Sequence, residues 1–215
     1  MNNQVNLEKL IKNIQLNIEQ GEQVPKLLLH SCCAPCSTYV LEYLSDYFEI
    51  IVYYYNPNIF PQEEYQKRAE EQQYLIHKMQ AKHPITCIVG DYESELFYDI
   101  VKGLENEPEC GIRCDKCYEL RLRKTRDLAN VLGVDYFTTT LTISPLKKAD
   151  KLNEIGLQLA KDCDVNYLVS DFKKKNGYKR STEISKEYQL YRQDFCGCIY
   201  SKLERDKRKN VWRKN

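Results

Sequence analysis

Apolar residues along the chain follow two patterns, stripes at helical spacing and short continuous runs. A stripe at helical spacing predicts an opening helix over about residues 6–20. Continuous runs rich in β-branched and aromatic residues predict buried strands at 26–30, 49–55, 85–89, 135–140 and 166–170. Helical patterns separate these runs, at 62–82, near 93–104, from the cysteines at 110–117 to about Leu132, and at 147–161.

This alternation of strands and helices predicts an α/β fold. Parallel strands joined by helices require right-handed crossovers, with helices covering both faces of the sheet. We therefore expect a single Rossmann-like domain over residues 1–215, a parallel sheet flanked by helices with a helical, basic C-terminal region. Residues 1–25 are interpreted as an N-terminal helix extension and residues 202–215 as a basic tail.

The carboxyl end of the first strand is the expected working edge of this sheet. In open parallel sheets, functional groups lie just outside the carboxyl ends of the strands. The thiols of Cys32, Cys33 and Cys36 follow the first strand directly. Ser37 is the predicted N-cap of the next helix. Thiols at the start of a helix feel the positive end of its dipole, which favours the thiolate form.

Composition narrows the class of protein. The chain of 215 residues is 42% hydrophobic, so it can bury a core without disulfides. Its apolar runs are shorter than the roughly 20 residues of a membrane span, and the N-terminal pattern lacks the apolar core of a signal peptide. We therefore expect a cytoplasmic protein with no membrane partner, in which grouped cysteines bind metal or act in redox chemistry.

The net charge of +1 hides a separation of charge between the two halves of the chain. Residues 1–110 carry 8 Lys and Arg against 17 Asp and Glu, whereas residues 111–215 carry 24 against 14. The basic half concentrates its cations in runs at 121–126, 173–180 and 205–214, interleaved with Tyr178, Tyr191, Tyr200 and Trp212. Single runs are usually solvated faces, but three runs with aromatics favour a polyanion-binding surface. Exposed aromatics stack on unpaired bases, which favours RNA over duplex DNA.

Eight of the ten cysteines fall into three tight groups. Cysteines that only fill a core occur singly, so this grouping indicates metal binding, redox chemistry or both. A C-x2-C motif is a common chelate for zinc and for iron–sulfur iron, and spacing does not separate the two. Cys87 and Cys163 stand alone and are interpreted as structural. The groups are Cys32-Cys33-x2-Cys36, Cys110-x3-Cys114-x2-Cys117 and Cys196-Gly197-Cys198.

The third group suits a different chemistry from the first two. A disulfide between residues i and i+2 closes a very small ring, so it is strained and readily reduced. Gly197 relieves the steric problem because it permits unusual backbone dihedral angles. We interpret Cys196 and Cys198 as a redox-active pair, with metal ligation as the alternative.

Four stretches of the chain together resemble the motifs of one enzyme family. Their order over residues 26–201 resembles that of the epoxyqueuosine reductases of the QueH type. The stretches are His30-x-Cys32-Cys33-Ala34-Pro35-Cys36, then Cys114-x2-Cys117-Tyr118-x2-Arg121-Leu122, then Tyr136-Phe137-Thr138-Thr139-Thr140-Leu141-x2-Ser144-Pro145, and finally Asp171-Phe172-Lys173-Lys174 with Tyr191-Arg192-Gln193-x-Phe195-Cys196-Gly197-Cys198.

The resemblance implies an oxidoreductase of tRNA processing and queuosine biosynthesis. Such an enzyme converts epoxyqueuosine to queuosine at the wobble position of tRNA by a two-electron removal of the epoxide oxygen. The implied partners are tRNA, contacted at its anticodon loop, and an external electron donor. The resemblance implies a [4Fe-4S] cluster held by Cys32, Cys33, Cys114 and Cys117. It also implies that Cys196 and Cys198 form a redox-active pair. Cys36 and Cys110 match further cysteines of the family, and the resemblance allows an additional iron.

A general acid is expected near the cluster, because the departing epoxide oxygen must be protonated. The candidates are Asp115, Tyr118, Asp171 and Asp194, and the sequence does not choose among them.

Two other classes of protein remain open. A zinc-stabilised RNA-binding module without catalysis would have no use for the third cysteine group. An iron–sulfur tRNA-thiolating enzyme on a similar fold would need a nucleotide-binding Ser-Gly-Gly-x-Asp-Ser loop after the first strand. That position holds Ser31 to Cys36 instead, which is evidence against ATP use.

Overall fold

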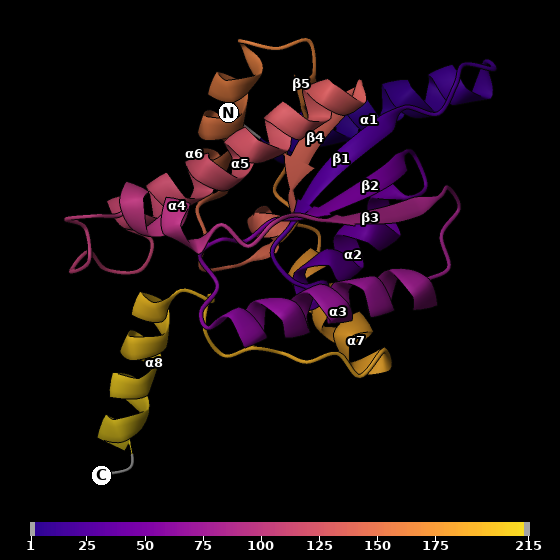
Figure 1. Cartoon of the computed structure of the whole chain (residues 1–215). Coiled ribbons are helices and arrows are strands. Elements are labelled where there is room, and N and C mark those ends of the chain that lie inside the picture. Colours follow the sequence, from indigo (N-terminus) through magenta and orange to yellow (C-terminus); the bar gives the residue numbers. More distant parts are fainter. Residues whose placement is uncertain (1–2, 213–215) are drawn as a thin grey trace.

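A computed structural model describes residues 3–212, with the side chains of residues 3–209 (Figure 1). A five-stranded sheet forms its centre, in the order β3-β2-β1-β4-β5 with every neighbouring pair parallel. The predicted α/β fold with a parallel sheet is confirmed. The strands are β1 (Lys26–Ser31), β2 (Glu49–Tyr54), β3 (Ile85–Val89), β4 (Tyr136–Thr139) and β5 (Asn166–Tyr167).

Helices cover both faces of the sheet because alternate side chains of each strand point to opposite faces. Leu27 and Leu29 of β1 join one apolar cluster with α1, α2 and α3, whereas Leu28 joins a second cluster with α5 and α6. The helices are α1 (Asn3–Glu19), α2 (Ala34–Leu44), α3 (Gln62–Lys78), α4 (Ser94–Ile100), α5 (Ile112–Leu132), α6 (Ala149–Ala160), α7 (Gly177–Glu187) and α8 (Ile199–Trp212), and a short 3-10 helix spans Thr140–Ile143.

The prediction of Ser37 as a helix N-cap is wrong. Helix α2 begins at Ala34, its N-cap is Cys33, and Ser37 lies inside the helix. Pro35 in the first turn explains the earlier start, since a proline there has a suitable φ and its missing N–H is not needed. The Ser37 hydroxyl donates instead to the Cys33 carbonyl at 3.0 Å. The earlier start places Cys36 within the first turn of the helix.

The strand expected at 166–170 ends at Tyr167. Beyond it, the side chain of Asn153 in α6 binds both backbone groups of Ser170, accepting from its N–H at 3.1 Å and donating to its carbonyl at 2.9 Å. These two bonds satisfy the backbone groups that a longer strand would pair with a neighbour. The two bonds hold the chain that follows β5 against α6.

The carboxyl ends of the strands and α8 frame the region that holds the grouped cysteines. Cys32 follows β1, and the 3-10 helix follows β4 at the adjoining strand end. Helix α8 extends away from the sheet beside this edge (Figure 1). Within residues 3–212, no helix is long and apolar enough to cross a membrane.

Candidate functional site

The first cysteine group lies where β1 ends and α2 begins. The sulfur atoms of Cys32, Cys33 and Cys36 lie within 4.8 Å of one another, and those of Cys32 and Cys33 are 3.8 Å apart. The extended backbone of Cys33 followed by the first turn of α2 brings the three thiols together. Three converging sulfur ligands are a suitable geometry for binding a thiophilic metal.

Hydrogen bonds make the three thiols chemically unequal. The thiols of Cys33 and Cys36 hydrogen bond with the Cys32 sulfur and hold the pKa of Cys32 well below its usual range. The same bond to Cys32 raises the pKa of Cys33 to about 12. Thr140 also donates to the Cys32 sulfur, at 3.6 Å. These hydrogen bonds favour the thiolate form at Cys32, the form in which a cysteine binds a metal or reacts.

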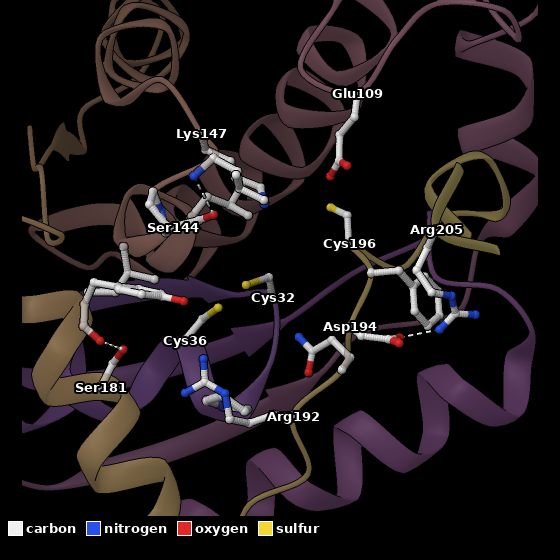
Figure 2. A pocket seen from close by; sticks show the side chains of 18 of the residues that line it. Cys32, Cys36, Glu109, Ser144, Lys147, Ser181, Arg192, Asp194, Cys196 and Arg205 are labelled. Atoms are coloured by element: carbon white, nitrogen blue, oxygen red, sulfur yellow. Dashed lines mark hydrogen bonds and ion pairs between the residues drawn. The ribbon is translucent and has the colours of Figure 1, made fainter. Parts of the chain in front are cut away.

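A cavity of about 600 Å³ opens beside this group. Cys32 and Cys36 face it from one side and Cys196 faces it from the other (Figure 2). Tyr178, with 41% of its surface exposed, contributes an aromatic ring to the wall. The remaining wall is rich in cations, namely Lys147, Arg192, Arg205, Arg208 and Lys209.

The second cysteine group lies at the start of α5. Cys114 and Cys117 occupy the first turns of the helix, and both line a small inner cavity with Tyr118. Burial raises the pKa of Cys114 to about 11 and that of Cys117 to about 12. Cys110 precedes the helix with a φ of 67°; its backbone N–H donates to the Cys114 sulfur at 3.2 Å.

The third group forms a tight turn fastened to the body of the protein. The carbonyl of Cys196 accepts from Arg68 at 3.3 Å, and the carbonyl of Gly197 accepts from the N–H of Phe60 at 2.9 Å. Gly197 has a φ of 132°, and a Cβ there would lie 3.0 Å from the side chain of Ile59. The prediction that Gly197 supplies an unusual backbone conformation is confirmed.

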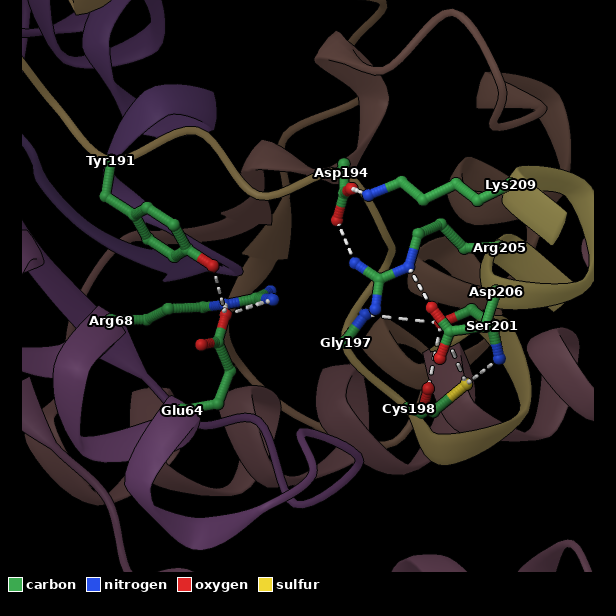
Figure 3. Close-up of polar contacts among 10 residues, drawn as sticks. All are labelled: Glu64, Arg68, Tyr191, Asp194, Gly197, Cys198, Ser201, Arg205, Asp206 and Lys209. Carbon is green, nitrogen blue, oxygen red and sulfur yellow. Dashed lines mark hydrogen bonds and ion pairs between the residues drawn. The ribbon is translucent and has the colours of Figure 1, made fainter. Parts of the chain in front are cut away.

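The two cysteines of this turn have different surroundings. Cys196 lines both the large and the small cavity, whereas Cys198 lines only the small one and is 8% exposed. The Cys198 thiol donates to the hydroxyl of Ser201 at 3.5 Å and accepts from the Ser201 N–H at 3.4 Å (Figure 3). Cys196 is therefore the accessible member of the pair and Cys198 the enclosed one.

The structure brings the three cysteine groups to one region, on two adjoining cavities. In the described part of the chain, three cysteines have all their sulfur atoms within 4.8 Å of one another. They are the members of the first group, Cys32, Cys33 and Cys36. Cys32 and Cys114 pack against one shared apolar cluster. The assignment of Cys32, Cys33, Cys114 and Cys117 as a ligand set remains a prediction. Cys87 lies within β3 and lines neither cavity.

The four candidate acids occupy different environments. Tyr118 lines the small cavity with the cysteines, and burial raises its pKa, so it keeps its proton at neutral pH. Asp194 lines the large cavity, but hydrogen bonds from Lys209 and Arg205 lower its pKa and keep it ionised (Figure 3). Asp171 pairs with Lys173 at 2.6 Å. Asp115 lines neither cavity. Tyr118 is thus the candidate beside the second and third cysteine groups, and Asp194 is the candidate on the large cavity.

Several cations of the predicted basic surface are buried or paired with carboxylates. In the run at 121–126, Arg121 is buried, Arg123 pairs with Glu119, and Lys124 pairs with Glu93. Arg180 of the second run likewise pairs with Glu42. Within the described residues, Arg192 and Arg208 on the large cavity have no ion pair, and neither do Lys174 and Lys179 of the second run. The side chain of Trp212 and the residues after it lie outside the described residues.

Lys147 is a site residue that the sequence analysis missed. It lines the large cavity, and although burial acts to lower its pKa, the nearby Cys196, Tyr118 and Cys32 raise it well above the usual range. Lys147 therefore remains a cation beside the thiols. It follows the Ser144-Pro145 motif by two residues, which is the signal that could have identified it.

A parallel α/β fold with three groups of thiols on adjoining cavities at its carboxyl edge defines a cysteine-dependent redox or metal-binding protein. The family model of epoxyqueuosine reductase QueH matches residues 27–204, so the chain belongs to this family of oxidoreductases.

Three relatives illustrate the range of similarity. An epoxyqueuosine reductase QueH of Streptococcus pyogenes serotype M1 is 43% identical over 202 residues, 93% of this chain and 79% of the relative. One of Staphylococcus epidermidis is 41% identical over 94% of this chain and 87% of its own length. An epoxyqueuosine reductase QueH of Thermotoga maritima is 32% identical over 83% of this chain and 91% of its own length.

Proposed function

We propose that this enzyme reduces epoxyqueuosine to queuosine at the wobble position of tRNA, with Cys196 and Cys198 as its redox-active pair and an iron–sulfur cluster as cofactor. The observation that carries the proposal is the position of Cys196. Its thiol faces a cavity of about 600 Å³ opposite Cys32 and Cys36, and Cys198 lies enclosed two residues away. An accessible thiol with a second thiol two residues away suits a two-electron reduction, because the two can close to a disulfide.

The large cavity suits a modified nucleoside presented from a single-stranded loop. Its volume lies within the range of about 300–1,000 Å³ that is usual for small-molecule sites. The exposed ring of Tyr178 offers a stacking surface for a base. Arg192 and Arg208 lie on the same wall and can bind the phosphates on either side of the nucleoside.

The Cys196–Cys198 dithiol can supply the electrons and protons that the reaction consumes. Removal of the epoxide oxygen as water requires two electrons and two protons and leaves a carbon–carbon double bond. Oxidation of two thiols to one disulfide supplies both electrons and both protons. The external electron donor then returns the Cys196–Cys198 disulfide to the dithiol. The positive charge of Lys147 at the large cavity stabilises the negative charge that develops on the departing oxygen.

The residues around the two cavities fit an anionic metal cluster held by thiolates. Sulfur ligands reach the region from both Cys32 and Cys117, and a buried cation, Arg121, lines both cavities. When bound, a [4Fe-4S] cluster would transfer electrons one at a time, and its iron could bind an oxygen atom. In this proposal Cys32, Cys33, Cys114 and Cys117 hold it. Cys36 and Cys110 lie beside these ligands and could hold the additional iron.

Analysis of tRNA nucleosides tests the proposed reaction. A strain that lacks the gene for this chain should accumulate epoxyqueuosine and lose queuosine in its tRNA, as measured by mass spectrometry. Expression of the intact chain should restore queuosine. Normal queuosine in the deletion strain, or no conversion of epoxyqueuosine-containing tRNA by the reduced, iron-loaded protein, would contradict the proposal.

Arg192 and Arg208 should govern tRNA binding without governing the chemistry. We expect the double substitution Arg192→Ala with Arg208→Ala to raise KM for tRNA at least about tenfold, with kcat little changed, because phosphate contacts are lost. The slope of log affinity against log salt should fall by roughly 0.7 for each lost contact. Arg123→Ala is the control, because Arg123 pairs with Glu119 and does not line the cavity. Equal salt slopes for the double variant and the control would argue against phosphate binding at this wall.

A further inference from the structure

Arg121 occupies a place that is costly for a charged side chain. It comes from α5, is 2% exposed, and lines both the large and the small cavity. Two other arginines are as deeply buried, and each has a carboxylate partner: Arg68 pairs with Glu64 and Arg113 with Glu204. Within the described residues, Arg121 has no such partner. A buried guanidinium without a carboxylate requires another source of negative charge.

Hydrogen bonds from Arg121 connect the first two cysteine groups. Its Nε donates to the carbonyl of Cys117 at 3.2 Å, and its Nη1 donates to Oδ1 of Asn56 at 3.2 Å. Nδ2 of Asn56 then donates to the carbonyl of Ser31 at 2.8 Å. Ser31 directly precedes Cys32 in the chain. A short series of hydrogen bonds therefore spans from the backbone of Cys117 to the residue before Cys32.

The third nitrogen of the guanidinium remains unused. Nη2 of Arg121 is fully buried and has no hydrogen-bond partner. A buried donor without an acceptor carries an uncompensated cost of desolvation. One nitrogen each of Arg68 and Arg113 is also without a hydrogen bond, but both of those guanidinium groups have a carboxylate partner. The side chain lies where the two cavities adjoin. Its guanidinium lies 5.6 Å from the centre of the Tyr118 ring, and the thiols of Cys117, Cys196 and Cys32 are close enough to interact with its charge. An anion bound where the two cavities adjoin would therefore both accept a hydrogen bond from Nη2 and balance the charge of Arg121.

We propose that Arg121 is a positioning residue that seats an anionic metal cluster between Cys32 and Cys117, with Nη2–H donating a hydrogen bond to a sulfur of that cluster. The inference rests on the iron–sulfur assignment made under the proposed function. It assigns Arg121 two tasks. The guanidinium offsets the negative charge of the thiolate-bound cluster, and its other two nitrogens keep the two cysteine groups in register. Hydrogen bonds and positive charge near cluster sulfurs raise the reduction potential of a cluster.

The test compares the native protein with Arg121→Gln, Arg121→Lys and the control Arg126→Gln after anaerobic reconstitution. Arg126 lies in the same helix, pairs with Asp127, and lines neither cavity. The measurements are iron and sulfide per chain, the midpoint potential of the cluster, and the electron paramagnetic resonance spectrum of the reduced protein. Circular dichroism establishes that each variant is folded.

We expect Arg121→Gln to have a more negative midpoint potential and an altered spectrum, or to lose iron while remaining folded, whereas Arg126→Gln matches the native protein. A folded, iron-loaded Arg121→Gln protein with native potential and spectrum would overturn the proposal. If Arg121→Gln does not fold, the Arg121→Lys variant provides the test, because lysine keeps the positive charge but lacks the three nitrogens of the guanidinium. We expect its reduced form to have an altered electron paramagnetic resonance spectrum. A native spectrum would overturn the proposal. Native protein that takes up no iron would instead contradict the iron–sulfur assignment itself.

Discussion

Cys196→Ser is expected to lower turnover of epoxyqueuosine-containing tRNA by at least about 100-fold, equivalent to ~2.7 kcal/mol in the activation barrier, while the iron content stays unchanged. The serine hydroxyl cannot form a disulfide, so the pair can no longer supply two electrons. Cys196 lines the large cavity but is not one of the proposed cluster ligands, which is why we expect activity and iron content to separate. Single-turnover assays with the prereduced protein and iron analysis of the same sample provide the measurement.

Cys87→Ser is the matched control for this variant. Cys87 lies within β3 and lines neither cavity, so its replacement should leave turnover unchanged. Cys198→Ser should also lose multiple turnover, because the enclosed thiol is the partner in the disulfide. Full activity of the Cys196→Ser protein would remove the pair from the mechanism, and loss of iron in that variant would move Cys196 into the ligand set.

Loss of the cluster is the second large expected effect. We expect Cys32→Ser, Cys33→Ser, Cys114→Ser and Cys117→Ser each to fall from about four irons per chain to less than about one, with loss of the absorbance near 400 nm, because a serine does not replace a thiolate as a ligand of iron. The measurement is iron, sulfide and zinc per chain after anaerobic reconstitution of each single variant.

Cys36→Ser and Cys110→Ser decide how the ligands are divided. The proposed set predicts that both variants retain the cluster. The structure makes Cys36 the sharper case, because its sulfur lies within 4.8 Å of those of Cys32 and Cys33. Iron loss in Cys36→Ser with iron retained in Cys114→Ser would replace the proposed ligand set. A colourless native protein with one zinc would favour the zinc-stabilised RNA-binding module. Cys163→Ser is the control, since its thiol donates only to nearby carbonyls.

The fold could be predicted from the sequence to a large extent because the signals are local. The apolar run at 85–89 gives β3 with the bounds Ile85–Val89, and the helix that follows the second cysteine group ends at Leu132 as predicted. The N-cap prediction failed where two local signals competed. Pro35 favoured a start that is earlier than Ser37 indicated, and the proline prevailed because its ring already holds φ near the helical value.

The charge pattern predicted less than the cysteine pattern. Arg121 reads in the sequence as one of several surface cations, yet it is buried between the cavities. Lys147 stands beside Lys148 and reads as a solvated cation unless the nearby Ser144-Pro145 motif is noticed, yet it lines the large cavity beside the thiols. A charged side chain is placed by what packs around it, and those partners come from distant segments of the chain. Neither position could be obtained from spacing alone.

The sequence by itself determined the α/β fold, the membership of three thiol groups and the need for glycine at position 197, because periodicity, spacing and backbone conformation are properties of short segments. Only the tertiary structure decided that Cys196 faces a large cavity while Cys198 is enclosed, that Tyr118 lines the small cavity with the thiols, and that Arg121 hydrogen bonds to the Cys117 carbonyl and to Asn56. Those outcomes depend on how β1, α5 and the segment before α8 pack together, and packing between distant segments leaves no local pattern in the sequence.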